Sequence, residues 1–224
     1  MTIAKHGAPS EDRREPLTRG RVVDAAIDLA DREGIEAVSM RKLGLVLGVE
    51  AMSLYTHIQG KDDLLDAMAD AVVAAIPREP INGGWQAQLR HTILGARSTL
   101  VRHLWAAQVI ETRTSPGLAT IRYMDAVVGI MLAGGLSVDL AHHSLHVLGS
   151  RVLGFGQDLY DDKSDVDPAA TAAMARELSK MFPSVGAIAL AASHEGGLGG
   201  CDDDVEFAFG LDLILDGLEL QRAR

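Results

Sequence analysis

The sequence predicts an all-α fold. Apolar residues recur at intervals of three and four along most of the 224 residues, Ala and Leu are abundant, and no segment keeps the alternation that a half-buried strand requires. Aromatic residues make up only 4% of the chain, which also disfavours a strand-rich fold. A chain of this length accommodates a small N-terminal helical unit joined by a long helix to a larger helical domain.

The first helix is predicted to begin after Thr18, which is a suitable N-cap. Leu17 and Val22 flank this cap at the spacing of a hydrophobic staple. Gly34 is expected to end the helix because glycine adopts the left-handed conformation of a C-cap without strain. The apolar stripe between these limits consists of Val22, Ala26, Leu29 and Ala30.

Two short helices follow with a glycine between them. The first begins at Ser39 and ends at Gly48, and Gly44 inside it should cost about 1 kcal/mol relative to Ala. The second is predicted over residues 50–57, with Glu50 as its N-terminal cap. Three side chains are spaced to face inward, namely Val49, Leu54 and Ile58.

A longer helix is predicted over residues 62–76, capped by Asp62 or Asp63, and the Pro and Gly residues of 77–84 end it. Further helices are expected at 85–104, 116–132, 137–159, 168–182, 185–192 and 203–220, and the glycine-rich segment 195–200 is expected to be mobile. We therefore divide the chain into a flexible arm (1–16), a three-helix helix-turn-helix unit (17–61) and a larger helical domain (62–224).

Charge is distributed unevenly along the chain. The net charge is −10, but residues 1–61 contain nine basic and nine acidic side chains, so the excess acidity belongs to the remainder. Basic side chains bracket the two short helices, among them Arg41, Lys42 and Lys61. Local positive charge of this kind is what phosphate binding requires, whatever the overall charge.

Several classes of protein are disfavoured by composition. Residues 1–16 lack the apolar segment of a signal peptide, and no apolar run in the sequence approaches the roughly 18 residues that a membrane span needs. Cys201 is the only cysteine, so an intramolecular disulfide or a thiolate metal cluster is not expected. We therefore predict a soluble cytoplasmic protein.

The segment from Ser39 to Leu65 resembles the DNA-binding domain of the TetR family of transcriptional regulators. The resemblance rests on Ser39-Met40-Arg41-Lys42-Leu43, Leu47-Gly48-Val49, Ser53-Leu54-Tyr55-Thr56-His57-Ile58 and Lys61-Asp62-Asp63-Leu64-Leu65. It implies that residues 50–57 form the recognition helix, that Tyr55 and Lys61 hold phosphates, and that Arg41, Ala51, Met52, Ser53 and Thr56 lie at or near the bases. Lys42 and His57 complete the predicted DNA-binding set.

The chemistry of these side chains is consistent with those roles. The guanidinium of Arg41 suits a guanine edge or a phosphate, and the hydroxyls of Ser53 and Thr56 donate or accept hydrogen bonds. Lys61 stands where a helix N-terminus adds its own partial positive charge. The alternative for Arg41 and Lys42 is a solvated polar face, and for Tyr55 a partly buried core aromatic.

The C-terminal part resembles the regulatory domain of family members similar to the tetracycline repressor. The last helix carries two apolar faces, as expected for a helix that packs on its own domain and on a second copy of the chain. With the helix from Ser137 it is predicted to form a four-helix dimer interface. The interface residues are Leu145, Leu148, Val152, Phe155, Phe209, Leu213 and Gly217, and the alternative is ordinary intramolecular core.

The resemblance also implies a cavity for a small-molecule effector among the helices of the larger domain. Its predicted polar points are His91, His103, Arg113 and Thr114, and its predicted apolar lining is Leu94, Trp105, Ile121, Met124, Val128 and Met131. The spacing of His142, His143 and His146 on one helix would allow two imidazoles to share an ion. The simpler interpretation is that these histidines are polar residues that line a cavity or an interface. No metal or cofactor is predicted.

Two other classes of function compete with this interpretation. An enzyme is disfavoured because the sequence has no Gly-rich phosphate loop, no G-x-S-x-G motif and no H-E-x-x-H motif. An architectural DNA-binding protein without a ligand remains an alternative, since an apolar pocket and an apolar core give the same sequence pattern. The predicted partners are therefore operator DNA, a small-molecule effector and a second copy of the chain, with no membrane. Operator sequence, ligand identity and the choice between repression and activation stay open.

Overall fold

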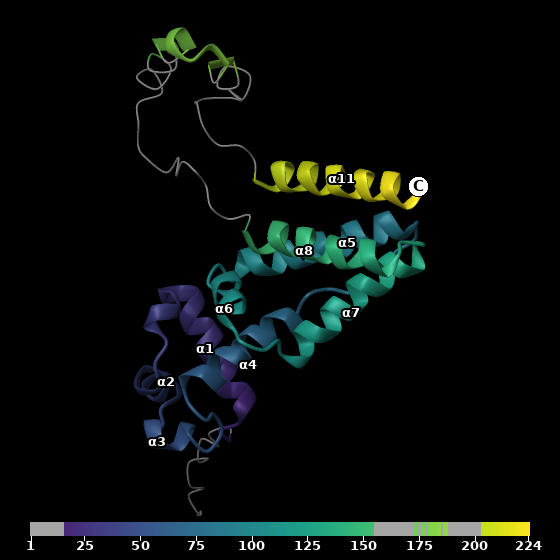
Figure 1. The fold of residues 1–224 in the computed structure, drawn as a ribbon. Coiled ribbons are helices and arrows are strands. Elements are labelled where there is room, and N and C mark those ends of the chain that lie inside the picture. The colour runs from purple at the N-terminus through teal and green to yellow at the C-terminus, as the bar shows by residue number, and fades with distance from the viewer. Residues whose placement is uncertain (1–15, 155–172, 174–175, 178, 185, 188–202) are drawn as a thin grey trace, which may run out of the picture.

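The structure is a computed structural model, and it describes residues 16–154, 173, 176–177, 179–184, 186–187 and 203–224. Every regular element in these ranges is helical, which confirms the all-α prediction. Figure 1 shows α1, α2 and α3 gathered at one end, with α11 at the opposite end beside α8 and α5. The principal elements are α1 (Arg19–Glu33), η1 (Ile35–Ala37), α2 (Met40–Leu47), α3 (Ala51–Leu54), α4 (Lys61–Ala74), α5 (Trp85–Arg102), α6 (Ala106–Thr112), α7 (Leu118–Ala133), α8 (Val138–Gly154) and α11 (Asp203–Arg222).

The ends of the first two helices are those predicted. The hydroxyl of Thr18 accepts from the backbone N–H of Arg21 at 3.2 Å, and α1 ends at Gly34, whose φ is 82°. The hydroxyl of Ser39 accepts from the backbone N–H of Lys42 at 3.3 Å. Gly48 ends α2 in the left-handed conformation, with φ 67° and ψ 35°. Side-chain and glycine caps thus fix the limits of both helices locally.

The next two helices differ from the prediction, α3 in its length and α4 in its start. α3 is a single turn over Ala51–Leu54 that continues as turn backbone to His57, and Glu50 occupies its N-cap position without a side-chain hydrogen bond. α4 begins one residue early, at Lys61, with Gly60 as its N-cap. Neither Asp62 nor Asp63 caps α4 because both lie inside its first turn.

The region after α5 contains a helix that the sequence analysis did not predict. α6 occupies Ala106–Thr112, between two predicted helices, and no side chain caps its start at Trp105. It is too short to show a clear periodicity. α7 begins at Leu118 and is capped from another helix, because Asp70 of α4 accepts from the backbone N–H of Ala119 at 2.8 Å.

Some expectations fall on residues outside the described ranges. They are the flexible arm up to residue 15, the end of the helix predicted over 137–159, the linker 161–167, most of the helices predicted over 168–182 and 185–192, the segment 195–200, Phe155 and Cys201.

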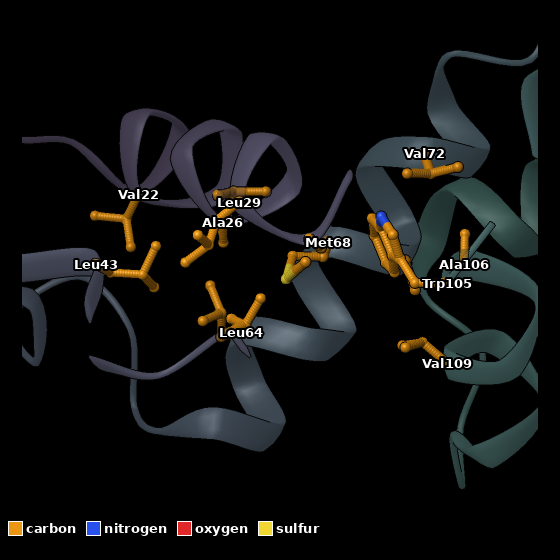
Figure 2. Packing of buried hydrophobic residues seen from close by; sticks show 14 of the residues in the cluster. Val22, Ala26, Leu29, Leu43, Leu64, Met68, Val72, Trp105, Ala106 and Val109 are labelled. Atoms are coloured by element: carbon orange, nitrogen blue, oxygen red, sulfur yellow. The ribbon is translucent and has the colours of Figure 1, made fainter. Parts of the chain in front are cut away.

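The largest hydrophobic cluster joins the helix-turn-helix helices to the rest of the protein. It contains Val22 and Leu29 of α1, Leu43 of α2, Met68 of α4 and Trp105 before α6. Figure 2 shows these side chains in one continuous row from α1 and α2 to α6. A separate cluster joins α5, α7, α8 and α11. The helix-turn-helix unit therefore shares its core with α4 and α6. None of the helices described is both long and apolar enough to cross a membrane.

Candidate functional site

The turn between α2 and α3 depends on a close backbone approach at Gly44. A Cβ at Gly44 would lie 2.8 Å from the carbonyl oxygen of Val49 and 3.2 Å from the backbone nitrogen of Ala51. The Gly44 carbonyl also accepts from the Val49 N–H at 2.9 Å. The expectation that Ala would be better here by helix propensity is therefore wrong. Glycine lets α3 pack closely on α2.

The side chains of α3 divide between core and solvent. Leu54 and Ile58 are fully buried beneath it. Met52 is 76% exposed and Tyr55 is 48% exposed, so both large side chains project from the unit. The other exposed members of the predicted DNA-binding set are Arg41, Ser53, Thr56 and Lys61.

Three members of the predicted set are less available. Lys42 is half-buried and forms an ion pair with Glu33, at the end of α1. Ala51 and His57 are half-buried, and the His57 carbonyl accepts from Arg19 at 2.9 Å. These contacts lie within the helix-turn-helix unit. The side chains available for DNA are therefore the exposed ones on α2, on α3 with the turn after it, and at the start of α4.

Arg19 and Asp63 connect α1 to the start of α4. The two side chains form a bidentate pair with N···O distances of 2.6 and 2.9 Å. Asp63 also accepts from the backbone N–H of Gln59 at 2.7 Å. The Arg19 hydrogen bond is the main cause that lowers the pKa of Asp63 to about 2. This pair joins α1 to the first turn of α4, which begins at Lys61, and it was not predicted from the sequence.

α4 is also held by polar contacts from the α6–α7 connection. Arg113, in the loop after α6, lies 3.3 Å from Asp66 and 3.8 Å from Asp62. One turn further along α4, Asp70 accepts from the N–H groups of Ala119 and Thr120 at the start of α7. Both ends of the α6–α7 connection therefore bind side chains on the same face of α4.

Two residues predicted for the effector cavity lie elsewhere. The indole N–H of Trp105 donates to Asp31 of α1 at 2.7 Å, and Nδ1 of His103 lies 2.9 Å from the same carboxylate. The Trp105 ring packs in the core shared with the helix-turn-helix unit. This placement corrects the cavity assignment for His103 and Trp105. Both residues belong to the junction between α1 and α6, a long-range contact that the sequence pattern does not reveal.

The remaining predicted cavity residues do not all converge. Met131 is fully buried in the core, whereas Ile121 is 47% exposed and Thr114 is also exposed. Half-buried positions are occupied by His91, Leu94, Met124 and Val128. Among the described residues, a hollow of about 480 Å³ between α5 and α11 includes Leu94, and one of about 430 Å³ between α4 and the α6–α7 connection includes Arg113.

Tyr123 is a further candidate that the sequence analysis missed. It lies on α7 and packs against the two clusters formed by the larger domain. Its hydroxyl is buried without a hydrogen-bond partner among the described residues. Burial also raises the pKa of this phenol. A buried hydroxyl without a partner is costly unless something else satisfies it.

The predicted dimer residues of α8 are mostly turned inward. Leu148 is only 1% exposed and lies in the core with α11, so it is not available to a partner, which corrects that assignment. Leu145 and Val152 are half-buried against the same core. Phe155 lies outside the described residues.

The predicted dimer residues of α11 face outward. Phe209 is 61% exposed and Leu213 is 58% exposed, while Phe207 and Leu211 on the other face are fully buried. A Cβ at Gly217 would meet no other atom within 4 Å. α11 thus has one apolar face in the core and a second on the surface.

The histidine cluster lies on the exposed surface of α8. The His142 ring centroid is 4.8 Å from that of His146 and 5.5 Å from that of His143. Nε2 of His143 is 3.8 Å from Asp139. Over the described ranges, no set of three or more His, Cys, Asp or Glu residues is arranged to hold a metal ion.

Comparison with known proteins places both parts of the chain in one family. Residues 22–68 match the family described as "Bacterial regulatory proteins, tetR family". Residues 76–222 match the family described as "Tetracyclin repressor-like, C-terminal domain". The two matches together cover most of the described helices.

Individual relatives are similar to this chain over nearly its full length. The HTH-type transcriptional repressor DrrR1 of Streptomyces coeruleorubidus is 34% identical over 223 residues, covering 95% of this chain and 81% of that protein. ActR of Streptomyces coelicolor in complex with (S)-DNPA is 28% identical, with a TM-score of 0.72 and coverage of 91% of this chain and 98% of that one. ActR in complex with actinorhodin gives a TM-score of 0.72 at 26% identity, with coverage of 94% and 100%. The chain belongs to the TetR family of transcriptional repressors.

Proposed function

We propose that the protein binds a palindromic operator as a homodimer and leaves it when a small-molecule ligand binds the larger domain. The observation that carries the proposal is that the helix-turn-helix unit has one face exposed to solvent and the opposite face buried in a shared core. Its outer face exposes Met52, Ser53 and Tyr55, whereas its inner face shares a core with α4 and α6. The unit that carries a surface suited to DNA is thus packed, through its opposite face, against the domain that would sense the ligand. Residues 17–61 would act as the DNA-binding unit and 62–224 as the sensor and dimerisation domain.

On the DNA, α3 would enter the major groove. Arg41, Met52, Ser53 and Thr56 would face base edges, and Tyr55 and Lys61 would contact phosphates. A single helical turn reads only a few base pairs, so two-fold symmetry would supply the rest of the site. Recognition helices of a bound dimer would lie about 34 to 36 Å apart, one turn of DNA.

The dimer would form through the exposed face of α11 and the neighbouring surface of α8. Val205, Phe209 and Leu213 are spaced four residues apart and are 58–61% exposed, and Gly217 continues the row without a side chain. Such a stripe permits close helix approach around a two-fold axis.

The ligand would bind among α5, α7 and α8, where the buried hydroxyl of Tyr123 would gain a partner. ActR, a related structure of the same fold, is known in complex with actinorhodin and with (S)-DNPA. An apolar or aromatic ligand with a polar group fits the surrounding clusters.

Release would run through α4. Arg113 and Asp70 tie α4 to the two ends of the α6–α7 connection, and Asp63 ties its start to α1. A ligand that moves this connection would therefore change the spacing of the two recognition helices. Coupling of about 1 to 3 kcal/mol, typical of such systems, weakens DNA binding roughly 5 to 150-fold.

The test begins with selection of bound duplexes from a random pool. A selected palindrome is expected, and its protein complex is then titrated with actinorhodin and related polycyclic compounds as probes. Because linkage is reciprocal, a true effector must bind the protein more weakly when the operator is saturating. Enrichment of no sequence would contradict the DNA-binding part, and equal ligand affinity with and without operator would contradict the release mechanism.

A further inference from the structure

A carboxylate on α1 binds two side chains that precede α6. Asp31 accepts from the indole N–H of Trp105 at 2.7 Å and lies 2.9 and 3.0 Å from Nδ1 of His103 through its two oxygens. The His103 and Trp105 rings meet edge to face, with centroids 6.2 Å apart. We refer to these three residues as the Asp31 junction.

The junction is partly shielded from solvent. Trp105 is 6% exposed, and the side chains of Asp31 and His103 are 27% and 21% exposed. The hydrogen bonds of Asp31 are therefore less screened than those of a surface ion pair. Hydrogen bonds to a charged group under such conditions are stronger than neutral ones.

Trp105 links the start of α6 to the core of the helix-turn-helix unit. Trp105 is the residue from which α6 starts, and its ring packs in the core shared by α1, α2 and α4. α6 also packs against α4 and α8. A displacement of α6 would therefore act on α1 directly through Asp31, independently of the contacts that hold α4.

We propose that Asp31 is a positioning residue for DNA binding. It holds α1 against the start of α6 in the conformation that fits the operator, and so forms a second link between sensor and helix-turn-helix beside α4. This inference rests on the proposed function. Asp31 would act through α1 and would not contact DNA.

The first test compares operator affinity among folded variants. Asp31→Ala should weaken binding to the selected operator about tenfold, a typical size for coupling between distant sites. Asp31→Asn should weaken it less, because its amide oxygen still accepts from Trp105. Asp28→Ala is the matched control, since Asp28 is an exposed carboxylate on the same helix without a hydrogen bond or ion pair among the described residues.

The second test reads the junction without changing Asp31. Trp85 and Trp105 are the only tryptophans, so a Trp85→Phe variant leaves Trp105 as the sole indole fluorophore. Saturating operator should change Trp105 emission, whereas a scrambled duplex of equal length should not. If the junction had only a structural role, replacing Asp31 would lower thermal stability, but the operator would not change Trp105 emission and operator affinity would not fall.

The outcomes separate this inference from the function on which it rests. If wild type binds no selected DNA, the proposed function fails. If wild type binds the operator, but Asp31→Ala binds it equally well and Trp105 emission does not respond, the positioning role is overturned while the repressor function stands. Weakened binding by Asp31→Ala, partial recovery in Asp31→Asn and an operator-specific Trp105 response together support it.

Discussion

Arg19 and Asp63 form a bidentate ion pair between α1 and the first turn of α4, with N···O distances of 2.6 and 2.9 Å. The pair lies at the junction where the helix-turn-helix unit passes into α4. Because Asp63 also accepts the Gln59 N–H, it satisfies a backbone donor just before α4 begins.

The first prediction concerns the pH dependence of this pair. The pKa of Asp63 is lowered from 3.8 to about 2, so its contribution to stability is present above pH 3.8 and is lost as the pH falls through about 2. Asp63→Asn should lower the free energy of unfolding at neutral pH by about 1 kcal/mol, a modest value because the pair is partly exposed. Urea denaturation at several pH values should show that the difference in unfolding free energy between wild type and Asp63→Asn becomes smaller below pH 3.8. Asp28→Asn should show no such trend, and a difference that persists unchanged to the lowest pH would rule out the pair as its cause.

The second prediction concerns Gly44. Gly44→Ala should destabilise the protein by about 1 to 3 kcal/mol because its methyl group would press on the Val49 carbonyl. Operator affinity should fall as well, since α3 must shift. Gly129→Ala, in the middle of α7 with open space around it, is the control and should be neutral or stabilising by up to about 1 kcal/mol. A stabilised Gly44→Ala protein would show that the backbone approach is not tight.

The third prediction separates phosphate contacts from base contacts. Lys61→Ala should weaken operator binding and reduce the slope of log K against log salt by roughly one unit, because one phosphate contact is lost. Ser53→Ala should instead alter sequence preference while leaving the slope intact. Arg122→Ala, an exposed cation on α7, serves as the control. An unchanged slope for Lys61→Ala at the selected operator would remove Lys61 from the interface.

The fourth prediction concerns dimerisation. Leu213→Glu places a charge in the exposed stripe of α11 and should shift the protein from dimer to monomer in sedimentation velocity experiments. Leu118→Glu is matched for exposure, at 57% against 58%, but lies on α7 and should leave the dimer intact. A dimer that survives Leu213→Glu would place the interface elsewhere.

The sequence was most informative where local chemistry decides the structure. Thr18, Ser39, Gly34 and Gly48 end their helices as predicted because caps depend on residues a few positions away. The exposure of Phe209 and Leu213 agrees with the second apolar face expected of the last helix.

Long-range contacts were not predictable in the same way. His103 and Trp105 are residue types that suit a cavity lining. Their actual partner, Asp31, lies 72 and 74 positions earlier in the chain. Gly44 shows the same limit, because helix propensity favours Ala whereas the Val49 carbonyl of the following turn excludes it. Leu148 fits either an interface or a core in sequence, and only the packing of α11 on α8 decides between them.

The stoichiometry of the operator complex tests the proposed function most directly. Native mass spectrometry or sedimentation of the protein with its selected duplex should give two protomers per full site, and removing one half-site should weaken binding severely. A single protomer that binds an isolated half-site as tightly as the full site would contradict the account of a two-fold symmetric repressor.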